Sequence, residues 1–307
     1  MPPYHFSAEL ARWGPEAEFS RPSRETAEDY CRQIATAHYE NFAVASWLLP
    51  RHLRQPFCNV YVYCRWADDL ADETEPGQTA LDLLDWWEGE LAAMYTGQAR
   101  HPVFVALAQT VETFEIPQQP FADLLVAFRR DQVQTRYATF DELLQYCRYS
   151  ANPVGRLVLY LGRSFNEEHA QLSDQICTGL QLANFWQDVA RDWHRGRLYL
   201  PLEDCERFKY HINDPAWGMA TPQFKQLLAY EVDRAEELLL AGRPLVKLVG
   251  RDLRWELDLI VRGGLAVLAG IRRRDYDVWS GRPKVSKLHK LSLVVRAWWA
   301  ARSESAT

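Results

Sequence analysis

Two carboxylates stand four residues apart in the most acidic run of the chain, where Asp68 and Asp72 belong to the sequence Asp-Asp-Leu-Ala-Asp-Glu. The residues before this run favour a helix, so both side chains lie on one helix face, about 6 Å apart along the axis. Like charges at this spacing destabilise a helix unless a cation neutralises them. The pair therefore indicates either a solvated acidic helix end or a site for a positively charged ligand.

Oxygen-bearing side chains recur with the same spacing further along the chain, at Asn184, Asp188 and Asp192. These positions are i, i+4 and i+8, so they form a stripe along one face of a helix. Phe185 and Trp186 lie on the flanking faces. A solvated surface helix rarely borders such a stripe with large rings, whereas a half-buried site for a hard cation does. The second stripe thus favours a cation site in both segments.

Side chains that offer only oxygen suit Mg²⁺, which keeps water ligands and shares its coordination shell with phosphate oxygens. Two such stripes facing each other would hold two or three Mg²⁺ ions on a diphosphate, neutralise it as a leaving group and draw it from an allylic or cyclopropylmethyl carbon. The carbocation left behind needs a dry cavity with aromatic faces. Aromatic residues make up 13% of the chain, and we expect a minority of them to line that cavity.

Other helical proteins also carry carboxylates in their interiors. A di-iron carboxylate bundle needs Glu-x-x-His pairs, and the sequence contains none. A class I terpene cyclase usually ends its second motif in Ser/Thr-x-x-x-Glu, where this chain has Asp188 and Asp192. A non-catalytic helical protein with a lipid cavity remains an alternative from a different class, and it predicts no Mg²⁺-dependent release of phosphate.

The elements that must position these residues are helices. Apolar side chains recur at steps of three and four residues, as in Leu81, Leu84 and Leu91, while proline and glycine fall mainly between such segments. The sequence has no Asn-Gly or Asp-Gly turn and no sustained alternation of period two. We therefore predict an all-α protein of about ten to twelve helices, with one domain over residues 23–302, a loosely ordered segment at 1–22 and a tail at 303–307.

Composition narrows the setting. The 307 residues include 35 basic and 41 acidic side chains, a net charge of −6 that predicts no general affinity for nucleic acid. No basic stretch leads into an apolar run at the N-terminus, and no window reaches about 18 uninterrupted apolar residues. The six cysteines are scattered, without a Cys-x-x-Cys pair. We expect reduced thiols, no secretory signal, no transmembrane helix and a cytoplasmic location.

Taken together, the order and spacing of the motifs resemble the squalene/phytoene synthase family, the head-to-head prenyl transferases. The resemblance runs from about His38 to Leu288, which is most of the chain. The motifs that carry it are His38-Tyr39-Glu40-Asn41-Phe42, Leu48-Leu49-Pro50, Tyr61 with Cys64-Arg65, the run from Asp68 to Asp72, Arg136-Tyr137-Ala138-Thr139, Glu142-Leu143, Tyr146-Cys147, residues 181–192, and Gly196-Arg197-Leu198-Tyr199-Leu200-Pro201.

The resemblance implies a single isoprenoid-synthase helical bundle with a central active-site cavity, and it implies roles for particular residues. The metal ligands it implies are Asp68, Asp72, Asn184, Asp188 and Asp192, with Arg65 on the diphosphate, Tyr146 and Tyr276 at the reacting centre, and His38, Asn41, Tyr61 and Gln181 on the substrate. For Arg65 the alternative is a structural i, i+4 partner of Asp69. Arg282, Lys284 and Lys287 would serve phosphate or an anionic membrane surface, unless they form a plain solvated charge run.

Departures from the family pattern point to one branch of it. The phytoene synthase and presqualene-forming branches typically read Asn-x-x-Arg-Asp-x-x-Glu-Asp in the second motif, but here Gln187 stands in place of the arginine and Arg191 in place of the glutamate. An extra arginine suits an enzyme that handles two diphosphates, so its loss points to a substrate with one. Residues 149–156 also stand in place of the usual Val-Ala-Gly-x-Val-Gly, and Pro153 among them would kink the helix beside the cavity.

These departures resemble the hydroxysqualene synthase branch of squalene and hopanoid biosynthesis. The expected reaction is Mg²⁺-assisted ionisation of presqualene diphosphate and capture of the cation by water, which Tyr146, Tyr276 or Gln187 would orient. The alternative is a presqualene diphosphate or phytoene synthase that condenses two prenyl diphosphates. We expect no NADPH, an isoprenoid diphosphate as the partner, and a downstream enzyme that reduces hydroxysqualene. The apolar substrate and product lead us to expect peripheral contact with the inner membrane face.

Overall fold

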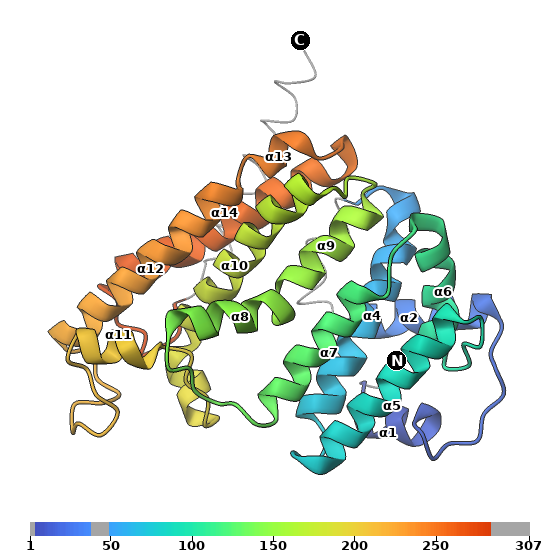
Figure 1. Cartoon of the computed structure of the whole chain (residues 1–307), viewed down its shortest axis with the longest axis horizontal. Helices are drawn as coiled ribbons and strands as arrows, with labels where there is room; N and C mark the ends of the chain where they lie inside the picture. Colours follow the sequence, from blue (N-terminus) through green and yellow to red (C-terminus); the bar gives the residue numbers. More distant parts are fainter. Residues whose placement is uncertain (1–3, 38–48, 284–307) are drawn as a thin grey trace, which may run out of the picture. The chain divides into compact units, whose positions relative to one another are not determined.

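The computed structural model describes residues 4–37 and 49–283 (Figure 1). Four predicted residues, His38, Asn41, Lys284 and Lys287, lie outside these ranges. Within them the all-α prediction is confirmed: the chain forms thirteen helices and no strand, with one isolated bridge between Arg136 and Leu198. The helices are α1 Phe6–Trp13, α2 Arg24–Ala37, α4 Arg51–Asp72, α5 Gln78–Tyr95, α6 Pro102–Phe114, α7 Gln119–Asp131, α8 Phe140–Ser150, α9 Asn152–Leu161, α10 Glu167–His194, α11 Leu202–Arg207, α12 Pro222–Gly242, α13 Leu245–Leu248 and α14 Arg251–Arg273.

The chain divides into two compact units. Unit 1 comprises residues 1–133 and 156–165, and unit 2 comprises residues 134–155 and 166–307. The single domain predicted for residues 23–302 therefore contains parts of both units. Each of the two predicted acidic stripes belongs to one unit, the first to α4 and the second to α10.

In unit 1, α4 packs against α2, α5, α6 and α7 (Figure 1). Its Trp66 is fully buried and stacks on Trp87 of α5, with ring centroids 5.2 Å apart. Tyr63, one turn earlier, donates its hydroxyl to the carbonyl of Phe121 at 2.9 Å. Buried rings of this size dominate core energetics. They fix the rotation of α4 about its axis, and so they determine which way the acidic face at its C-terminal end points.

The N-terminal segment, predicted to be loosely ordered, makes specific contacts in unit 1. Phe6 of α1 is buried and packs edge-on against Trp66 at 5.2 Å between ring centroids. Trp13 contacts Tyr30 of α2 in the same manner at 5.9 Å. The sequence pattern of α1 is short and has no strong cap, so local propensity does not reveal this docking. Tertiary packing of the buried Phe6 ring and the partly buried Trp13 ring supplies it instead.

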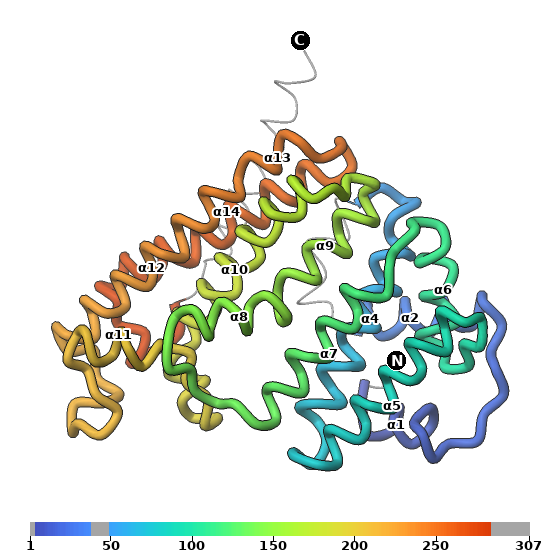
Figure 2. The backbone as a smooth tube through the Cα atoms, viewed as in Figure 1, coloured from blue at the N-terminus to red at the C-terminus, as the bar shows by residue number. Residues whose placement is uncertain are grey.

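In unit 2, α10 is the longest helix and runs beside α12 and α14 (Figure 2). Asn166 caps the N-terminus of α10, because its side-chain oxygen accepts a hydrogen bond from the backbone amide of His169 at 2.8 Å. Gly179 lets α12 approach closely, because a Cβ there would come within 2.8 Å of Leu239 Cγ. A hydrogen in place of a side chain thus brings the two helices together one turn before the polar stripe begins.

The kink predicted at Pro153 takes the form of a break between α8 and α9 at Ala151. Proline cannot donate a backbone hydrogen bond, which ends one helix and begins the next. Asn152, at the start of α9, is held against α10 because its side-chain oxygen accepts the hydroxyl of Thr178 at 2.9 Å. Gly155 faces Ser173 on α10 so closely that a Cβ would come within 2.3 Å of the Ser173 oxygen. The broken helix is therefore tied firmly to the helix that carries the second stripe.

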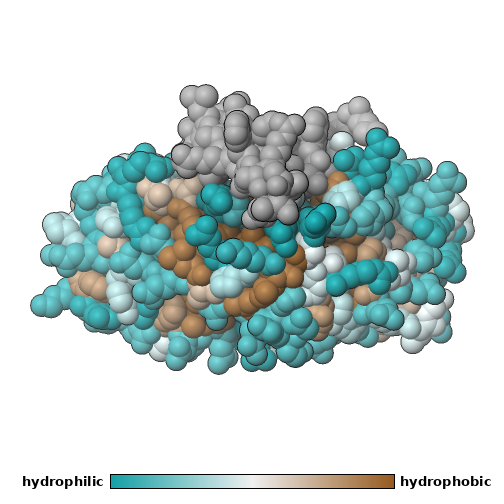
Figure 3. Space-filling model, turned by 90° about the horizontal axis from the view of Figure 1, so that it is seen from above, coloured by the Kyte–Doolittle hydropathy of each residue, from teal (hydrophilic) through white to brown (hydrophobic). Residues whose placement is uncertain are grey.

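Hydrophilic side chains cover most of the described surface on the face drawn in Figure 3. No helix among residues 4–37 and 49–283 is both long and apolar enough to cross a membrane.

Candidate active site

A positively charged side chain on α4 itself, that of Arg65, pairs with the acidic stripe of this helix. Arg65 directs its guanidinium to Asp69, with Nε 3.0 Å from Oδ2 and a second, shorter contact from Nη2 to Oδ1, and its Nη1 lies 3.2 Å from Asp68 Oδ2. The partnership with Asp69 that the sequence offers as the alternative for Arg65 is therefore present. It does not exclude a role on the diphosphate, because the same guanidinium also reaches the predicted metal ligand Asp68.

Asp69 is the buried anchor of this group. Its side chain is fully buried, whereas that of Asp68 is 46% exposed. Tyr4 donates its hydroxyl to Asp69 Oδ2 at 2.9 Å. Burial raises the pKa of Asp69, while the opposing pull of Arg65 and the Tyr4 hydrogen bond favour its charged form. The buried Asp69 thus holds Arg65 in place, and the guanidinium of Arg65 also contacts Asp68.

The other predicted residues of α4 lie on the same side of the helix. Asp72 is exposed one turn beyond Asp68, which leaves both carboxylates accessible to a cation. Tyr61 is partly buried one turn before Arg65, and burial raises its pKa. Tyr61, Arg65, Asp68 and Asp72 therefore follow one another along a single face, as their spacing predicts.

The stripe of α10 becomes more buried along its length. Asn184 is exposed, the Asp188 side chain is 16% exposed, and Asp192 is partly buried. Burial and the neighbouring Asp188 carboxylate raise the pKa of Asp192 to about 6. A divalent cation would relieve the repulsion between two carboxylates in such a poorly solvated position.

An arginine from a distant part of the chain forms an ion pair with Asp188. Arg282 follows α14 and grips the carboxylate with two contacts, Nε to Oδ1 at 2.5 Å and Nη2 to Oδ2 at 2.9 Å. The same Nη2 lies 3.1 Å from the side-chain oxygen of Gln187, whose Nε2 donates to the carbonyl of Pro283 at 2.6 Å. Gln187 is 7% exposed. The sequence predicts that position 187 lacks a positive charge, yet the structure brings a guanidinium to that place from residue 282.

Aromatic rings gather beside this stripe. Phe185 stacks on Tyr199 with 3.7 Å between ring centroids and 9° between ring planes, and Tyr146 of α8 lies 5.9 Å from Tyr199. Tyr137 also stacks on Tyr199, with 5.8 Å between ring centroids. Tyr146 is 4% exposed. Ring faces of this kind would stabilise a carbocation, and the cluster includes one of the two tyrosines predicted at the reacting centre.

The two remaining predicted residues, Gln181 and Tyr276, also belong to unit 2. Gln181 is partly buried on α10, one turn before Asn184. Tyr276 follows α14 in the left-handed backbone region, with φ of 59°, and its amide donates to the carbonyl of Ile271. An L-residue adopts this conformation at a cost, and it ends α14 a few residues before Arg282. The roles of Gln181 and Tyr276 on the substrate stay predictions, as do the roles of the other site residues.

The donor set of each stripe fits Mg²⁺ in type. The α4 stripe offers carboxylate oxygens, and the α10 stripe offers carboxylate and amide oxygens. The contact with Arg282 shows that a positive charge already satisfies Asp188. Among the residues that the structure describes, no three carboxylate, imidazole or thiol groups form a ready-made metal site within one cluster. Each stripe thus contributes two carboxylates, and the rest of a coordination shell would come from water and phosphate oxygens.

Sequence reasoning missed three supporting contacts. Tyr4 lies 65 residues from Asp69, and Arg282 lies 94 residues from Asp188. No local spacing signals either pair. Tyr199 is part of a recognised motif, but its stack on Phe185 depends on how the segment after α10 folds back. Only the contact between Arg65 and Asp69 has a local signal, because the two residues are four apart on a helix.

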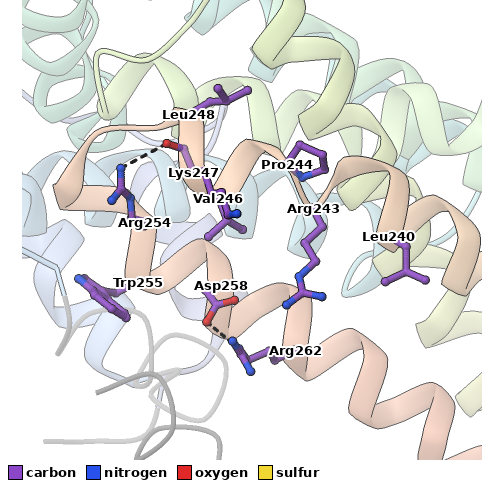
Figure 4. A pocket seen from close by; sticks show the side chains of 10 residues that line it. All are labelled: Leu240, Arg243, Pro244, Val246, Lys247, Leu248, Arg254, Trp255, Asp258 and Arg262. Carbon is purple, nitrogen blue, oxygen red and sulfur yellow. Dashed lines mark hydrogen bonds and ion pairs between the residues drawn. The ribbon is translucent and has the colours of Figure 1, made fainter. Parts of the chain in front are cut away.

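A separate groove of about 700 Å³ lies in unit 2 between α12, α13 and α14 (Figure 4). None of the predicted site residues lines it. Its lining combines basic side chains with apolar ones: Arg243, Lys247, Arg254 and Arg262 with Leu240, Pro244, Val246, Leu248 and Trp255, and Asp258 in an ion pair with Arg262. Leu240 and Leu248 are 46% and 47% exposed. The groove has no carboxylate stripe and so does not compete with α4 and α10 for the chemistry.

The chain is similar to known proteins over most of its length. The model of the squalene/phytoene synthase family matches residues 35–289. The chain is 32% identical to the 15-cis-phytoene synthase of Synechocystis sp. over 292 residues, 91% of this chain and 87% of that protein. It is 37% identical to the hydroxysqualene synthase of Rhodopseudomonas palustris over 240 residues, 77% of this chain and 80% of that protein.

A solved structure with the same fold is that of the squalene synthase HpnC from Alicyclobacillus acidocaldarius. It has a TM-score of 0.79 and 44% sequence identity, and the alignment covers 82% of this chain and 95% of that one. The all-α architecture described above is therefore the isoprenoid-synthase fold of these enzymes.

Proposed function

The chain belongs to the squalene/phytoene synthase family, and we propose that within it the chain converts presqualene diphosphate to hydroxysqualene. The observation that carries this choice is the pattern of identity. The chain shares a larger fraction of aligned residues with the hydroxysqualene synthase and with HpnC than with the phytoene synthase. The missing arginine at position 187 no longer supports the choice by its charge, because Arg282 supplies a guanidinium there.

A presqualene diphosphate or phytoene synthase is the second candidate. Two observations favour it. The phytoene synthase matches a longer stretch of the chain than the hydroxysqualene synthase does. The guanidinium of Arg282 beside Gln187 also provides the charge that a second diphosphate would need.

In the proposed reaction the chain's residues hold the leaving group and its counter-ions. Asp68 and Asp72 on α4, and Asn184, Asp188 and Asp192 on α10, would hold Mg²⁺, which when bound neutralises the diphosphate as it departs. Arg65, fixed by Asp69, would donate hydrogen bonds to the same diphosphate. A guanidinium that is already held by a buried carboxylate loses little freedom when it binds phosphate oxygens. It therefore promotes ionisation more effectively than a mobile side chain would.

The bonds balance without a redox partner. The carbon–oxygen bond to diphosphate breaks and its electron pair leaves with the diphosphate. The carbocation rearranges, a water oxygen forms the new carbon–oxygen bond, and a water proton is released. Gln187 already uses both ends of its amide for Arg282 and Pro283. We therefore assign the orientation of the water to Tyr146 or Tyr276, and we propose that the enzyme needs no NADPH.

The aromatic cluster around Tyr199 would protect the cation until water reaches it. Its ring faces stabilise positive charge and its apolar surface excludes other nucleophiles. Tyr146 combines a ring face with a hydroxyl, which suits a residue that contacts both the cation and the incoming water.

The substrate decides between the two candidates. We would incubate the purified protein and Mg²⁺ separately with presqualene diphosphate and with farnesyl diphosphate, and identify the products by mass spectrometry. Hydroxysqualene from presqualene diphosphate supports the proposal. Conversion of farnesyl diphosphate to presqualene diphosphate, with presqualene diphosphate itself left intact, would assign the chain to the second candidate.

We also propose peripheral contact with an anionic membrane surface and delivery of hydroxysqualene to an enzyme that reduces it. The groove of α12 to α14 supports the first part, because basic side chains surround two half-exposed leucines there. Sedimentation with phosphatidylglycerol vesicles, compared with phosphatidylcholine vesicles, tests it. Binding to the anionic vesicles should fall when Arg243 and Lys247 are both changed to glutamate. Equal binding of both vesicle types would contradict an electrostatic contact.

A further inference from the structure

We propose that Arg282 is an exchangeable counter-ion of Asp188: it holds the carboxylate until a divalent cation binds, and then turns to the diphosphate. The inference rests on the proposed assignment of Asp188 as a metal ligand. It adds an order of events at that ligand, in which one positively charged group leaves the carboxylate as another arrives.

The contact has the geometry of a site prepared for a cation. Arg282 meets both oxygens of Asp188, at 2.5 and 2.9 Å, which is the two-pronged arrangement that guanidinium forms with carboxylate. Asp192 lies one turn further along α10, and its carboxylate adds to the negative potential on this face. Arg191, Arg195 and Arg197 offset part of this potential at Asp192. At Asp188 an ion with two charges competes with the single charge of the guanidinium.

The backbone beside Arg282 is held while its side chain is accessible. Gln187 is 7% exposed and donates to the carbonyl of Pro283, itself buried, at 2.6 Å. The Arg282 side chain is 48% exposed. Release of Asp188 therefore requires rotation of one side chain and leaves the attachment of the segment to α10 intact. The guanidinium then remains within reach of a ligand bound on that face.

Arg65 lacks this freedom. Its main partner, Asp69, is completely buried and receives a second hydrogen bond from Tyr4, and the Arg65 side chain is 22% exposed. Leaving Asp69 would strand a buried carboxylate, which is strongly unfavourable. Leaving Asp188 strands no charge once a metal ion takes the place of the guanidinium, and it gives up only the neutral hydrogen bond from Nη2 to the side-chain oxygen of Gln187. Arg282 is for this reason the exchangeable arginine of the two.

The freed guanidinium has a natural new partner. Arginine binds phosphate oxygens with the same two-pronged geometry that it uses for carboxylate. Metal binding at Asp188 would therefore release a group that recognises the diphosphate, so that each ligand assists the other. Removal of Arg282 should accordingly have opposite effects on the binding of a metal ion alone and on the binding of diphosphate with metal.

Two binding measurements without any prenyl substrate test this inference. The first titrates Mn²⁺ into wild-type protein and into the Arg282→Gln variant and follows free Mn²⁺ by electron paramagnetic resonance. The second titrates inorganic diphosphate at saturating Mg²⁺ by calorimetry. Arg282→Gln should bind Mn²⁺ about 3- to 10-fold more tightly and diphosphate about 10-fold more weakly than wild type.

Arg274→Gln is the matched control, because Arg274 belongs to the same segment and contacts Asp277 and Ser280 instead of the stripe. It should change neither affinity. Arg282→Lys keeps the charge without the two-pronged geometry and should recover only part of the diphosphate binding. If Arg282→Gln binds Mn²⁺ with unchanged or weaker affinity, Arg282 does not compete with the metal ion for Asp188. If its affinity for diphosphate is unchanged, the released guanidinium does not bind the diphosphate. Because neither experiment involves turnover, both results stand whichever product the enzyme forms.

Discussion

The acidic stripes of α4 and α10 are similar in sequence but differ in how their charges are balanced. On α4 the balancing arginine, Arg65, is part of the same helix and is locked by the buried Asp69. On α10 the balancing arginine, Arg282, comes from beyond α14 and is half exposed. One stripe is therefore built with a fixed positive charge, and the other with a charge that can be replaced. The difference suggests that equal spacing of carboxylates does not imply equal readiness to bind a metal ion.

The largest expected effect tests whether both stripes are needed. Asp72→Ala and Asp188→Ala should each lower kcat/KM by at least about 1,000-fold, because each removes a carboxylate that we propose holds Mg²⁺ on the leaving group. Circular dichroism should show the same helix content as wild type, since Asp72 is exposed and the side chain of Asp188 contacts Arg282, which lies outside the helices. Full activity of either variant at saturating Mg²⁺ would remove that stripe from the site.

A second variant tests the fixed charge of α4. Asp69→Asn removes the buried partner of Arg65 and should lower the free energy of unfolding by roughly 3 kcal/mol. It should also weaken the binding of inorganic diphosphate, because Arg65 is no longer held. Chemical denaturation and calorimetry measure the two effects. If stability falls while diphosphate binding is unchanged, Arg65 is a structural partner of Asp69 and nothing more.

A third charge cluster in unit 2 shows what a structural group looks like. Glu231 of α12 is fully buried and lies beside Asp204 and Arg234. Arg234 Nη1 is 3.4 Å from Glu231 Oε1 and 2.7 Å from Asp204 Oδ2. Burial, together with a hydrogen bond to Asp204, raises the pKa of Glu231 from 4.5 to about 9. The folded state thus keeps a proton that the unfolded state loses above about pH 4.5, so this group makes the protein less stable as pH rises from 4.5 to 9.

Glu231→Gln mimics the protonated side chain and should flatten this pH dependence. The variant should gain roughly 1–3 kcal/mol over wild type near pH 9 and little near pH 5. Thermal unfolding at several pH values measures the difference, and kcat should not change. A variant that loses activity while it gains stability would link this cluster to the site and blur its contrast with the α10 stripe.

The smallest expected effect concerns Tyr4. Tyr4→Phe removes the hydroxyl that donates to Asp69 and should reduce the free energy of unfolding by about 1–2 kcal/mol. Asp69 and Arg65 remain paired in this variant, so activity should stay close to that of wild type. A loss of stability as large as that of Asp69→Asn would mean that the N-terminal segment, and not the ion pair, is the main support of the α4 stripe.

The sequence allowed prediction of whatever depends on neighbours along a helix. The all-α fold, the two stripes and the pairing of Arg65 with Asp69 follow from periodicity and four-residue spacing. The break before Pro153 follows from the chemistry of proline. The docking of Phe6 on Trp66, the hydrogen bond of Tyr4 and the grip of Arg282 on Asp188 join distant segments. Such contacts are selected by packing of the whole chain, and no local pattern encodes them.

The most direct test of the proposed reaction follows the oxygen atom of the product. Presqualene diphosphate should be turned over with Mg²⁺ in water enriched in ¹⁸O, and the product should be analysed by mass spectrometry. We predict hydroxysqualene whose hydroxyl carries ¹⁸O, together with release of one diphosphate per molecule. Presqualene diphosphate that is recovered unchanged, under conditions in which farnesyl diphosphate is consumed, would contradict the assignment.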